Sequence, residues 1–447
     1  MLQYAALRAP RYTSYPAATE FGPDVTSATS DNWLAACPVD APLSLYIHVP
    51  FCEQVCWYCA CNMKLGQNPD VLRKYADGLI ANLDLVASRL PARMQIGQLH
   101  WGGGTPTAMG VDLMAKVMEA VRSRFDMTAN AEIAVELDPR TFRANMAPAL
   151  GAMGVTRASL GVQTFDDHVQ KVVNRVQPFE VVRDAVHNLR EASVHSINFD
   201  MMYGLPFQTA EIVERDVEAA LDLIPDRVAL FGYAHVPWAA KRQRIIPEDA
   251  LPEADVRLDA ATRATRQMAD RGYQAIGLDH FALPEDTLAQ AARNGTLKRN
   301  FQGYSVDPSD TLIGIGASAI SEFREGYSQN APDTGRWSKA IEAKLLPTIR
   351  GTTLGNEDRL RRDVINELMC NLCVDVDRIL AAYKMPQDHL DTEISTLREL
   401  AADGLLSIDE RSIVVADKAR SLLRLVAAAF DAYRPEGMEA MRHAVLV

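Results

Sequence analysis

The sequence predicts a parallel α/β fold, built as a complete or partial βα barrel, for most of the chain. The first observation is an alternation of strand-like runs with amphipathic helical stretches between Leu43 and about Leu283, with no low-complexity segment among them. The second is the number of strand-like runs, because six or more βα units are enough for such a barrel. The third is the length of 447 residues, which leaves room for appended segments.

The strand candidates are short runs rich in apolar and β-branched residues. They are Leu43–Phe51, Gln98–Gly104, Glu132–Pro139, Arg157–Thr164, Ser196–Gly204 and Arg227–Val236, with Tyr273–Leu283 as a later addition. A helix is expected after the first strand, because Asn68 suits the N-cap and Pro69 suits the first helical position. One buried face is predicted by apolar residues at three- and four-residue spacing, namely Leu72, Tyr75, Leu79, Leu83, Val86 and Leu90.

Side-chain alternation along three of these strands selects candidate site residues. Ile133 and Val135 share one face of the third strand, so Glu136 points to the other face. The same alternation puts Gln163 and Asp200 near the ends of the next two strands, on the presumed inner face. Active sites of βα barrels gather at the carboxyl ends of the strands, which makes these three polar residues candidates. The competing interpretation is that they face solvent.

Four of the seven cysteines fall within ten residues, directly after the first strand: Cys52, Cys56, Cys59 and Cys61. In a reducing compartment such a cluster indicates metal or redox chemistry rather than disulfides. The first three have the spacing CxxxCxxC, and three thiolates can bind three irons of a [4Fe–4S] cube and leave the fourth iron open. Zinc is the alternative, with Cys61 or His48 completing a tetrahedron.

The remaining cysteines are assigned no metal. Cys370 and Cys373 belong to a helical pattern without a partnering loop, so we expect buried free thiols there. Cys37 lies in a proline-rich segment and has no evident role.

The end of the chain has a different pattern from the barrel. After Glu357 the sequence predicts helices, then a hairpin over Leu405–Val415, then a helix from Asp417 to about Tyr433, an order that resembles a winged helix. Between Asp388 and Asp403, acidic residues outnumber the single Arg398, whereas a DNA-recognition helix needs the opposite balance. We therefore expect an accessory or lid domain.

Composition and charge exclude several classes of protein. The chain is 48% hydrophobic and 23% charged, as in ordinary globular proteins, with a net charge of −12. An acidic chain is not expected to bind nucleic acid or an anionic membrane. There is no apolar run of about 18 residues and no apolar core of a signal peptide near the start, so the expected location is cytoplasmic, without a membrane span.

A glycine-rich motif, His100-Trp-Gly-Gly-Gly-Thr-Pro106, ends the second strand, and glycines there let the backbone approach a ligand closely. Together with the CxxxCxxC loop, it resembles the radical S-adenosylmethionine (SAM) enzymes and, among them, the oxygen-independent coproporphyrinogen III oxidases. The resemblance covers nearly the whole chain. Its segments are Arg11–Pro16, Leu45–Cys52, His100–Thr107, Val135–Pro139, Leu160–Gln163, Val173–Arg175, Asp200–Pro206, Tyr233–His235, Asp279–Phe281, Arg299–Tyr304 and Gly316–Ser321. Ala17 and Ala60 depart from the family's usual Thr and Gly.

The resemblance implies an incomplete TIM-type (β/α)6 barrel with an N-terminal extension and a C-terminal, mainly helical, winged-helix-like domain. The expected domains are residues 1–40, covering the active site, 41–350, the barrel, and 351–447, the helical domain. A monomer is expected.

The resemblance also implies one [4Fe–4S] cluster and two SAM molecules. Cys52, Cys56 and Cys59 match the cluster ligands. The positions that match contacts to the cluster-bound SAM are Tyr46, Tyr58, Gly103, Glu136 and Ile320. Those around the second SAM are Gly104, Thr105, Gln163, Arg175, Asp200 and Ala234.

The activity that the resemblance implies is oxidative decarboxylation of two propionates of coproporphyrinogen III to vinyl groups, giving protoporphyrinogen IX in haem biosynthesis. Cys61, Phe301 and Gln302 are the candidate catalytic residues, and an unidentified electron donor and acceptor are required. Arg11, Lys298 and Arg299 are candidates for binding the substrate carboxylates. The alternatives are a haem-binding chaperone, another radical SAM enzyme acting on tetrapyrroles, and a zinc-structured regulator.

Overall fold

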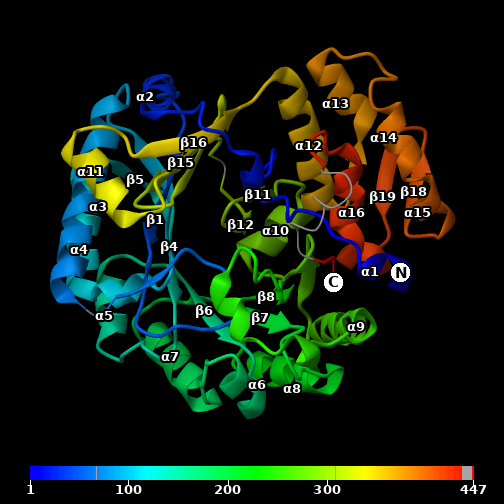
Figure 1. Ribbon diagram of the computed structural model, residues 1–447, viewed down its shortest axis with the longest axis horizontal. Helices are drawn as coiled ribbons and strands as arrows, with labels where there is room; N and C mark the ends of the chain where they lie inside the picture. Colours follow the sequence, from blue (N-terminus) through cyan, green and yellow to red (C-terminus); the bar gives the residue numbers. More distant parts are fainter. Residues whose placement is uncertain (67, 308, 435–444, 447) are drawn as a thin grey trace. The chain divides into compact units, whose positions relative to one another are not determined.

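The computed structural model describes residues 1–66, 68–307, 309–434 and 445–446, and it divides into two compact units (Figure 1). The cysteine-loop unit comprises Phe21–Asp200 and Asp307–Thr353. The C-terminal unit comprises Met1–Glu20, Met201–Val306 and Leu354–Val447. The division of the chain at residues 40 and 350 stays a prediction.

The cysteine-loop unit is built on a mainly parallel sheet. Its strand order is β16-β15-β14-β13-β1-β4-β5-β6-β7, and β13, β1, β4, β5 and β6 pair in parallel. The bounds are β16 Thr348–Thr353, β15 Gly326–Asn330, β14 Ile320–Phe323, β13 Leu312–Ile315, β1 Leu43–Val49, β4 Gln95–Gly103, β5 Asp126–Leu137, β6 Arg157–Gln163 and β7 Ser196–Tyr203. The short parallel pair β2 (Phe51–Cys52) and β3 (Lys64–Leu65) flanks the cysteine loop.

Helices α3, α4, α5 and α7 lie along one side of these strands, as the βα alternation predicts (Figure 1). The helices of this unit are α2 Ser27–Ala35, α3 Pro69–Arg89, α4 Val111–Arg124, α5 Met146–Ala152, α6 Asp167–Val172, α7 Phe179–Glu191 and α11 Thr334–Glu342, with a 3₁₀ turn η2 Pro106–Met109. The predicted start of α3 is confirmed, because the side chain of Asn68 accepts a hydrogen bond of 2.9 Å from the Asp70 N–H. All six residues of its predicted apolar stripe are buried.

Strands β13 to β16 are absent from the strand candidates, although β13 is a short apolar run, Leu-Ile-Gly-Ile. An apolar pattern is missing from β15. Strand β15 is entirely buried, yet it carries Ser328, Gln329 and Asn330. Its polar side chains are satisfied internally: Asn330 Nδ2 donates to the carbonyls of Gly314 and Gly316, and Gln329 Nε2 donates to that of Ser318. Buried polar groups with hydrogen-bond partners are stable, but a strand that contains them lacks the apolar pattern by which strands are predicted.

The C-terminal unit combines three small sheets with helices. Beyond Asp200 the end of β7 belongs to it and is followed in the sheet by β8 Arg227–Gly232, β10 His280–Ala282 and β9 Gln274–Ile276. The other strands are the hairpin β11 Lys298–Asn300 with β12 Gly303–Ser305, and the sheet β17 Cys373–Asp375, β19 Ser412–Val415 and β18 Leu406–Asp409. Residues 273–283 thus form two antiparallel strands rather than one added strand.

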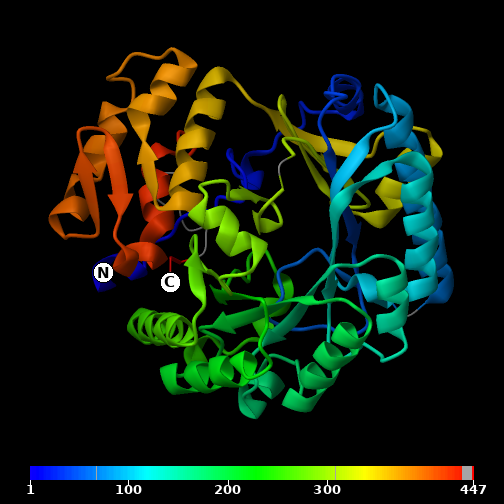
Figure 2. The same cartoon turned by 180° about the vertical axis from the view of Figure 1, so that it is seen from behind.

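The helices of the C-terminal unit are α1 Leu2–Ala5, α8 Ala210–Leu221, α9 Ala254–Asp270, α10 Thr287–Arg293, α12 Asn356–Asn371, α13 Val376–Tyr383, α14 Asp391–Thr396, α15 Arg398–Ala402 and α16 Leu423–Ala427, with 3₁₀ turns η1 Ala18–Glu20, η3 Lys241–Ile245, η4 Glu248–Ala250, η5 Asp417–Leu422 and η6 Ala428–Phe430. Figure 2 shows its last part, in orange to red, as helices around a small sheet. The predicted hairpin over Leu405–Val415 is confirmed.

Two expectations for this unit are wrong. The predicted continuous helix over residues 417–433 is a series of short α and 3₁₀ turns. Cys373 is exposed and lies on β17 rather than on a helix, whereas Cys370 is buried as expected.

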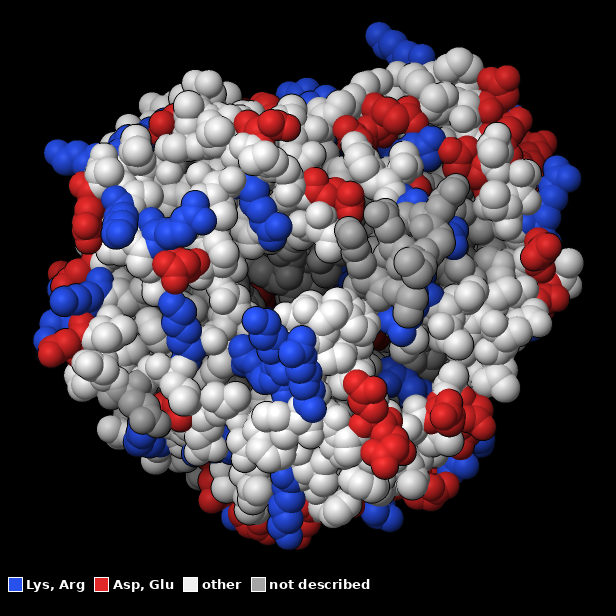
Figure 3. Space-filling view, viewed as in Figure 1, with Lys and Arg blue, Asp and Glu red and all other residues white. Residues whose placement is uncertain are grey.

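The face drawn in Figure 3 carries both acidic and basic side chains. On the face drawn in Figure 3, acidic and basic side chains are interspersed, in a chain with 58 Asp and Glu against 46 Lys and Arg. Within the described residues, no helix is long and apolar enough to cross a membrane.

Candidate cluster and cofactor site

Of the three CxxxCxxC cysteines, Cys52 ends β2, and Cys56 and Cys59 lie on the loop between β2 and β3. Other elements fix that loop. The Trp57 N–H donates to the carbonyl of Val173 at 3.0 Å, and Asn174 Nδ2 donates to that of Val55 at 2.7 Å. On the other side, the Thr105 N–H, directly after the glycines, donates to the carbonyl of Phe51 on β2 at 2.7 Å. The loop is therefore tied both to the end of α6 and to the glycine-rich end of β4.

Each of the three sulfurs has a hydrogen-bond donor beside it. Thr105 Oγ1 lies 3.5 Å from Cys52 Sγ, and the Cys61 N–H lies 3.4 Å from Cys59 Sγ. Burial raises the pKa of the Cys52 thiol to about 11, and the Thr105 hydroxyl opposes that rise. Donors placed around sulfurs complement the negative charge that metal-bound thiolates carry.

The sulfur of Cys56 receives the strongest donors. Arg140 Nη2 lies 3.1 Å from it and Arg175 Nη1 lies 3.3 Å from it. Both guanidinium groups also contact Asp138, with Arg140 Nη2 2.6 Å from Asp138 Oδ2 and Arg175 Nη2 3.3 Å from Asp138 Oδ1. Burial alone would raise the pKa of Asp138, but Arg175 and Arg140 outweigh it and hold that pKa below its usual value. The result is a buried cluster of two cations and one carboxylate against a thiol.

Sequence reasoning did not select Asp138 and Arg140. Their position in the sequence could have indicated a site, because both charged residues directly follow the carboxyl end of β5. Their convergence with Arg175, which lies 37 residues beyond Asp138, comes from the fold.

The glycine-rich end of β4 has no space for larger side chains. A Cβ on Gly104 would lie 2.6 Å from the Phe51 carbonyl oxygen and 3.0 Å from Cys52 Sγ. Gly103 has a φ of +116°, a conformation that favours glycine, and its N–H donates to Glu136 Oε2 at 3.0 Å. These glycines bring the backbone next to both the cysteine loop and the carboxylate predicted at the end of β5.

Glu136 is held in its ionised form. His100 Nε2 lies 3.1 Å from Glu136 Oε1, and the Gly103 N–H contacts the other oxygen. Burial alone would raise the pKa of Glu136, yet the hydrogen bond and charge of His100 and the backbone donor lower it. An ionised, half-buried carboxylate beside the cysteine loop suits a cationic or hydrogen-bond-donating ligand.

Sheet register brings two further predicted residues together. Tyr46 on β1 is paired with Gly314 on β13, and a Cβ on that glycine would lie 2.6 Å from the carbonyl oxygen of Ile320. The hydroxyl of Tyr46 lies 3.1 Å from His48 Nδ1. Tyr58, on the cysteine loop itself, is half-buried, and desolvation raises its pKa well above 10.

The remaining candidates of this unit lie at the ends of β6 and β7. Gln163 has a φ of +68° and a buried side-chain oxygen without a hydrogen-bond partner. Asp200 accepts from Ser159 Oγ at 2.8 Å and from Asn198 Nδ2 at 3.0 Å. Arg175 donates to the carbonyl of Gly161. An unpaired buried amide oxygen is costly unless a ligand donor reaches it.

Three predicted residues belong to the C-terminal unit. Ala234 follows β8, and its carbonyl accepts from Gln243 Nε2 at 3.1 Å. Phe301 and Gln302 form the turn between β11 and β12, where the Gln302 N–H donates to Asn300 Oδ1 at 2.9 Å. Their proximity to the cysteine loop stays a prediction. Cys61 is exposed, beside Cys59.

The donor set fits a cluster bound by three thiolates. Three sulfurs on one loop each face hydrogen-bond donors, and the adjacent glycine backbone leaves space that a Cβ would fill. Among the residues that the structure describes, no three His, Cys, Asp or Glu side chains converge on the position of a single metal ion.

Comparison with known proteins shows the family of the chain. The radical SAM superfamily model matches residues 46–220. The oxygen-independent coproporphyrinogen III oxidase of Bradyrhizobium diazoefficiens is 43% identical over 99% of both chains, and that of Salmonella typhimurium is 38% identical over 95% of this chain and 93% of its own. The structure of the Escherichia coli coproporphyrinogen III oxidase, described as a radical SAM enzyme, covers 96% of this chain and 100% of its own, with a TM-score of 0.90 and 37% identity. By sequence and fold, the chain belongs to the family of oxygen-independent coproporphyrinogen III oxidases.

Proposed function

We propose that the protein converts coproporphyrinogen III to protoporphyrinogen IX without oxygen. Each of two propionate side chains loses a β-hydrogen atom, CO₂ and one electron, and becomes a vinyl group. The hydrogen atom goes to a radical derived from SAM, and the electron goes to an acceptor that is not yet identified. The observation that carries this proposal is the cysteine loop, with cationic and neutral donors facing its sulfurs, in a chain so similar to these oxidases.

A [4Fe–4S] cluster on Cys52, Cys56 and Cys59, with SAM at its open iron, supplies the hydrogen-abstracting radical when both are bound. The protein's own groups hold and orient the co-substrate. Glu136 and the Gly103 backbone offer a carboxylate and a close approach for the SAM that contacts the cluster.

A second SAM molecule is part of the proposal. The unpaired oxygen of Gln163 supports it, because a ligand amine or hydroxyl would satisfy that buried acceptor. Asp200 lies on β7, and Arg175, which follows α6, donates to the carbonyl of Gly161 on the neighbouring strand β6. The two side chains could hold oppositely charged groups of the same ligand.

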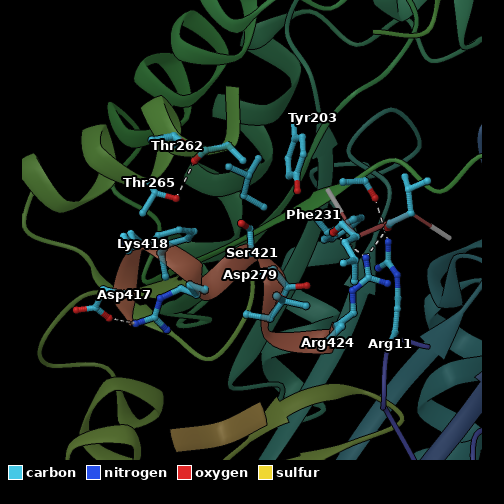
Figure 4. Close-up of a pocket in the computed structure, with 18 residues that line it drawn as sticks. Arg11, Tyr203, Phe231, Thr262, Thr265, Asp279, Asp417, Lys418, Ser421 and Arg424 are labelled. Atoms are coloured by element: carbon cyan, nitrogen blue, oxygen red, sulfur yellow. Dashed lines mark hydrogen bonds and ion pairs between the residues drawn. The ribbon is translucent and has the colours of Figure 1, made fainter. Parts of the chain in front are cut away.

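A cavity in the C-terminal unit supports carboxylate binding by Arg11 (Figure 4). Its volume is about 170 Å³, smaller than the ~300–1,000 Å³ of sites for drug-sized ligands, so it suits one propionate arm rather than a macrocycle. Figure 4 shows the guanidinium groups of Arg11 and Arg424 near each other on one side of it. Leu230 and Phe231 supply apolar lining for methylene groups.

The charge balance of this cavity favours an anion. Burial, reinforced by Arg11, lowers the pKa of Arg424 to about 10. Asp279 and Asp417 are the acids of the lining, against the four cations Arg11, Lys418, Arg420 and Arg424. Burial would raise the pKa of Asp279, but His280, Arg299 and Arg11 lower it well below its usual value. Arg11 is exposed, and its hydrogen bond of 3.0 Å to the carbonyl of Gly232 uses only Nη2, which leaves other donors for a carboxylate.

The contacts of Arg299 support an indirect role for this residue. Its Nε and Nη2 donate to the carbonyls of Tyr12 and Arg11, so it holds the N-terminal segment that carries Arg11. We therefore assign it a supporting part in substrate binding.

Replacing Arg11 with Gln is expected to raise KM for coproporphyrinogen III about 10- to 100-fold, because a charge-assisted hydrogen bond contributes about 1.5–3 kcal/mol. Cleavage of SAM in the absence of porphyrinogen should stay unchanged. Steady-state kinetics and a separate assay of SAM cleavage measure the two effects. Arg244→Gln, a change at an exposed arginine of the same unit, is the control and should leave both unchanged. Equal KM values for the two variants would remove Arg11 from the substrate site.

The proposed function is tested by incubating anaerobically prepared protein with coproporphyrinogen III, SAM and a strong reductant. Product mass and absorbance should show the loss of two CO₂ and the gain of two vinyl groups. Tight haem binding without turnover would favour a haem-binding chaperone, and ring opening would favour another tetrapyrrole-acting radical SAM enzyme.

The predictions of a cytoplasmic monomer with an unidentified electron donor form part of this proposal.

A further inference from the structure

The contact between Arg140 and Cys56 distinguishes one of the three cysteines from the other two. A hydroxyl lies beside Cys52 and a backbone N–H beside Cys59, and neither donor carries a net charge. The donors beside Cys56 are two guanidinium groups, at 3.1 and 3.3 Å. The side chain of Arg140 is 5% exposed and Cys56 is 7% exposed, so solvent screens this contact poorly.

The direction of the Arg140 guanidinium is fixed by its other partners. Its Nε lies 3.0 Å from Asp138 Oδ1, and its Nη2 lies 2.6 Å from Asp138 Oδ2, a bidentate arrangement. Its Nη1 donates to the carbonyl of Asn174 at 3.3 Å. Nη2 therefore faces the sulfur of Cys56 without freedom to turn away.

The net charge around that sulfur is positive. Arg140 and Arg175 contribute two positive charges, and Asp138 contributes one negative charge. Asp138 balances the charge of one of the two arginines. The charge of the other arginine remains, so one excess positive charge lies beside the thiol.

We propose that Arg140, through its hydrogen bond to the Cys56 thiolate, raises the reduction potential of the iron–sulfur cluster. The inference depends on the proposed binding of the cluster by Cys52, Cys56 and Cys59. The physical reason is that reduction adds one electron to the cluster, and a cationic donor on a ligand sulfur stabilises the added negative charge. Arg140 acts through a ligand and is therefore a positioning residue. Its effect is to make the cluster accessible to weaker biological reductants.

The test compares the midpoint potential of the reconstituted wild-type protein with that of Arg140→Gln, by redox titration followed by electron paramagnetic resonance. We expect iron content to be unchanged and the equilibrium constant for one-electron reduction to fall about tenfold, which corresponds to a shift of about 59 mV to a more negative potential. Turnover with a very strong reductant should be affected less than turnover with a weak one.

The matched control is Arg143→Gln, which removes the same charge three residues further along the chain. Arg143 is exposed and pairs with Glu53 of the cysteine loop at 3.0 Å. We expect the midpoint potential of the cluster in Arg143→Gln to equal that of the wild type, because the removed charge lies in solvent and does not contact a ligand sulfur. A similar shift in both variants would assign the effect to general charge and would overturn the inference.

Arg140→Lys is the second variant, in case glutamine disturbs Asp138. Lysine keeps the positive charge but loses the bidentate geometry, so its potential should lie between those of the wild type and Arg140→Gln. If iron is retained and neither variant shifts the potential, the inference is wrong while the proposed function stands. If both variants lose iron, Arg140 is needed for assembly of the cluster, and the inference that it sets the reduction potential is overturned. A wild-type protein that binds no cluster contradicts the proposed function itself.

Discussion

Serine variants of Cys52, Cys56 and Cys59 should each lose the cluster and all turnover. A serine hydroxyl is a harder and far less acidic ligand than a cysteine thiol, and iron–sulfur clusters require soft thiolates. We expect iron and sulfide per chain after anaerobic reconstitution to fall close to zero in the triple variant. Each single variant should show a large loss of both, together with loss of the visible absorbance of the cluster. Formation of protoporphyrinogen should drop to background in all four proteins.

The matched control for these variants is Cys373→Ser. Cys373 is an exposed thiol on β17 of the C-terminal unit, so the same chemical change there should leave iron content and activity unchanged. Cys61→Ser addresses a different question, because Cys61 is exposed and its backbone N–H, which serine keeps, donates to Cys59. Retained iron with lost turnover would place Cys61 in the chemistry. A triple serine variant that still forms vinyl groups would disprove the whole assignment.

The sequence carries enough information for much of the site because that information is local. The spacing of three cysteines is a property of one loop, and side-chain alternation is a property of single strands. Alternation along β5 is sufficient to select Glu136, and in the fold its carboxylate contacts His100 and the Gly103 backbone. The carboxyl ends of parallel strands meet at one edge of the sheet, which is why residues on different strands can be assigned to one site.

The features that sequence reasoning missed depend on distant parts of the chain. Asp138, Arg140 and Arg175 come together only because the ends of β5 and α6 are neighbours, and no pattern within either segment requires it. Strand β15 has buried polar residues with internal partners, so its burial leaves no hydrophobic alternation. The last helix is broken into short turns although its apolar residues, such as Leu423 and Phe430, are buried, so composition alone did not reveal its breaks.

Replacing Glu136 with Gln is expected to weaken SAM binding to the cluster-loaded protein about 3- to 10-fold, since charge-assisted hydrogen bonds contribute about 1.5–3 kcal/mol and neutral ones about half of that. Glutamine has nearly the same shape, so the fold should be kept. The Gly103 N–H and His100 would then face an amide in place of a carboxylate. Equilibrium binding of SAM under anaerobic conditions measures the effect.

The pH dependence of SAM binding follows from the lowered pKa of Glu136. Burial opposes ionisation, but the hydrogen bond and charge of His100 and the Gly103 donor prevail, so the folded-state pKa lies below the ordinary value of 4.5. A carboxyl group with a depressed pKa contributes stability that is present above its unfolded pKa and is lost as pH falls through the folded one. The contribution of Glu136 to SAM affinity should therefore stay constant from neutral pH down to its ordinary pKa and decline only below it.

Glu132→Gln is the matched control for Glu136→Gln. Glu132 lies on the same strand and the same face, four residues earlier, and it accepts from Arg157 at 2.9 Å. The two variants remove the same charge from β5, but only Glu136 contacts the backbone of the glycine-rich motif. We expect SAM affinity to fall in Glu136→Gln and to stay at the wild-type value in Glu132→Gln. If both variants bind SAM with wild-type affinity, Glu136 does not contact SAM. If both lose affinity to the same extent, the effect comes from the charge of the strand and not from a contact.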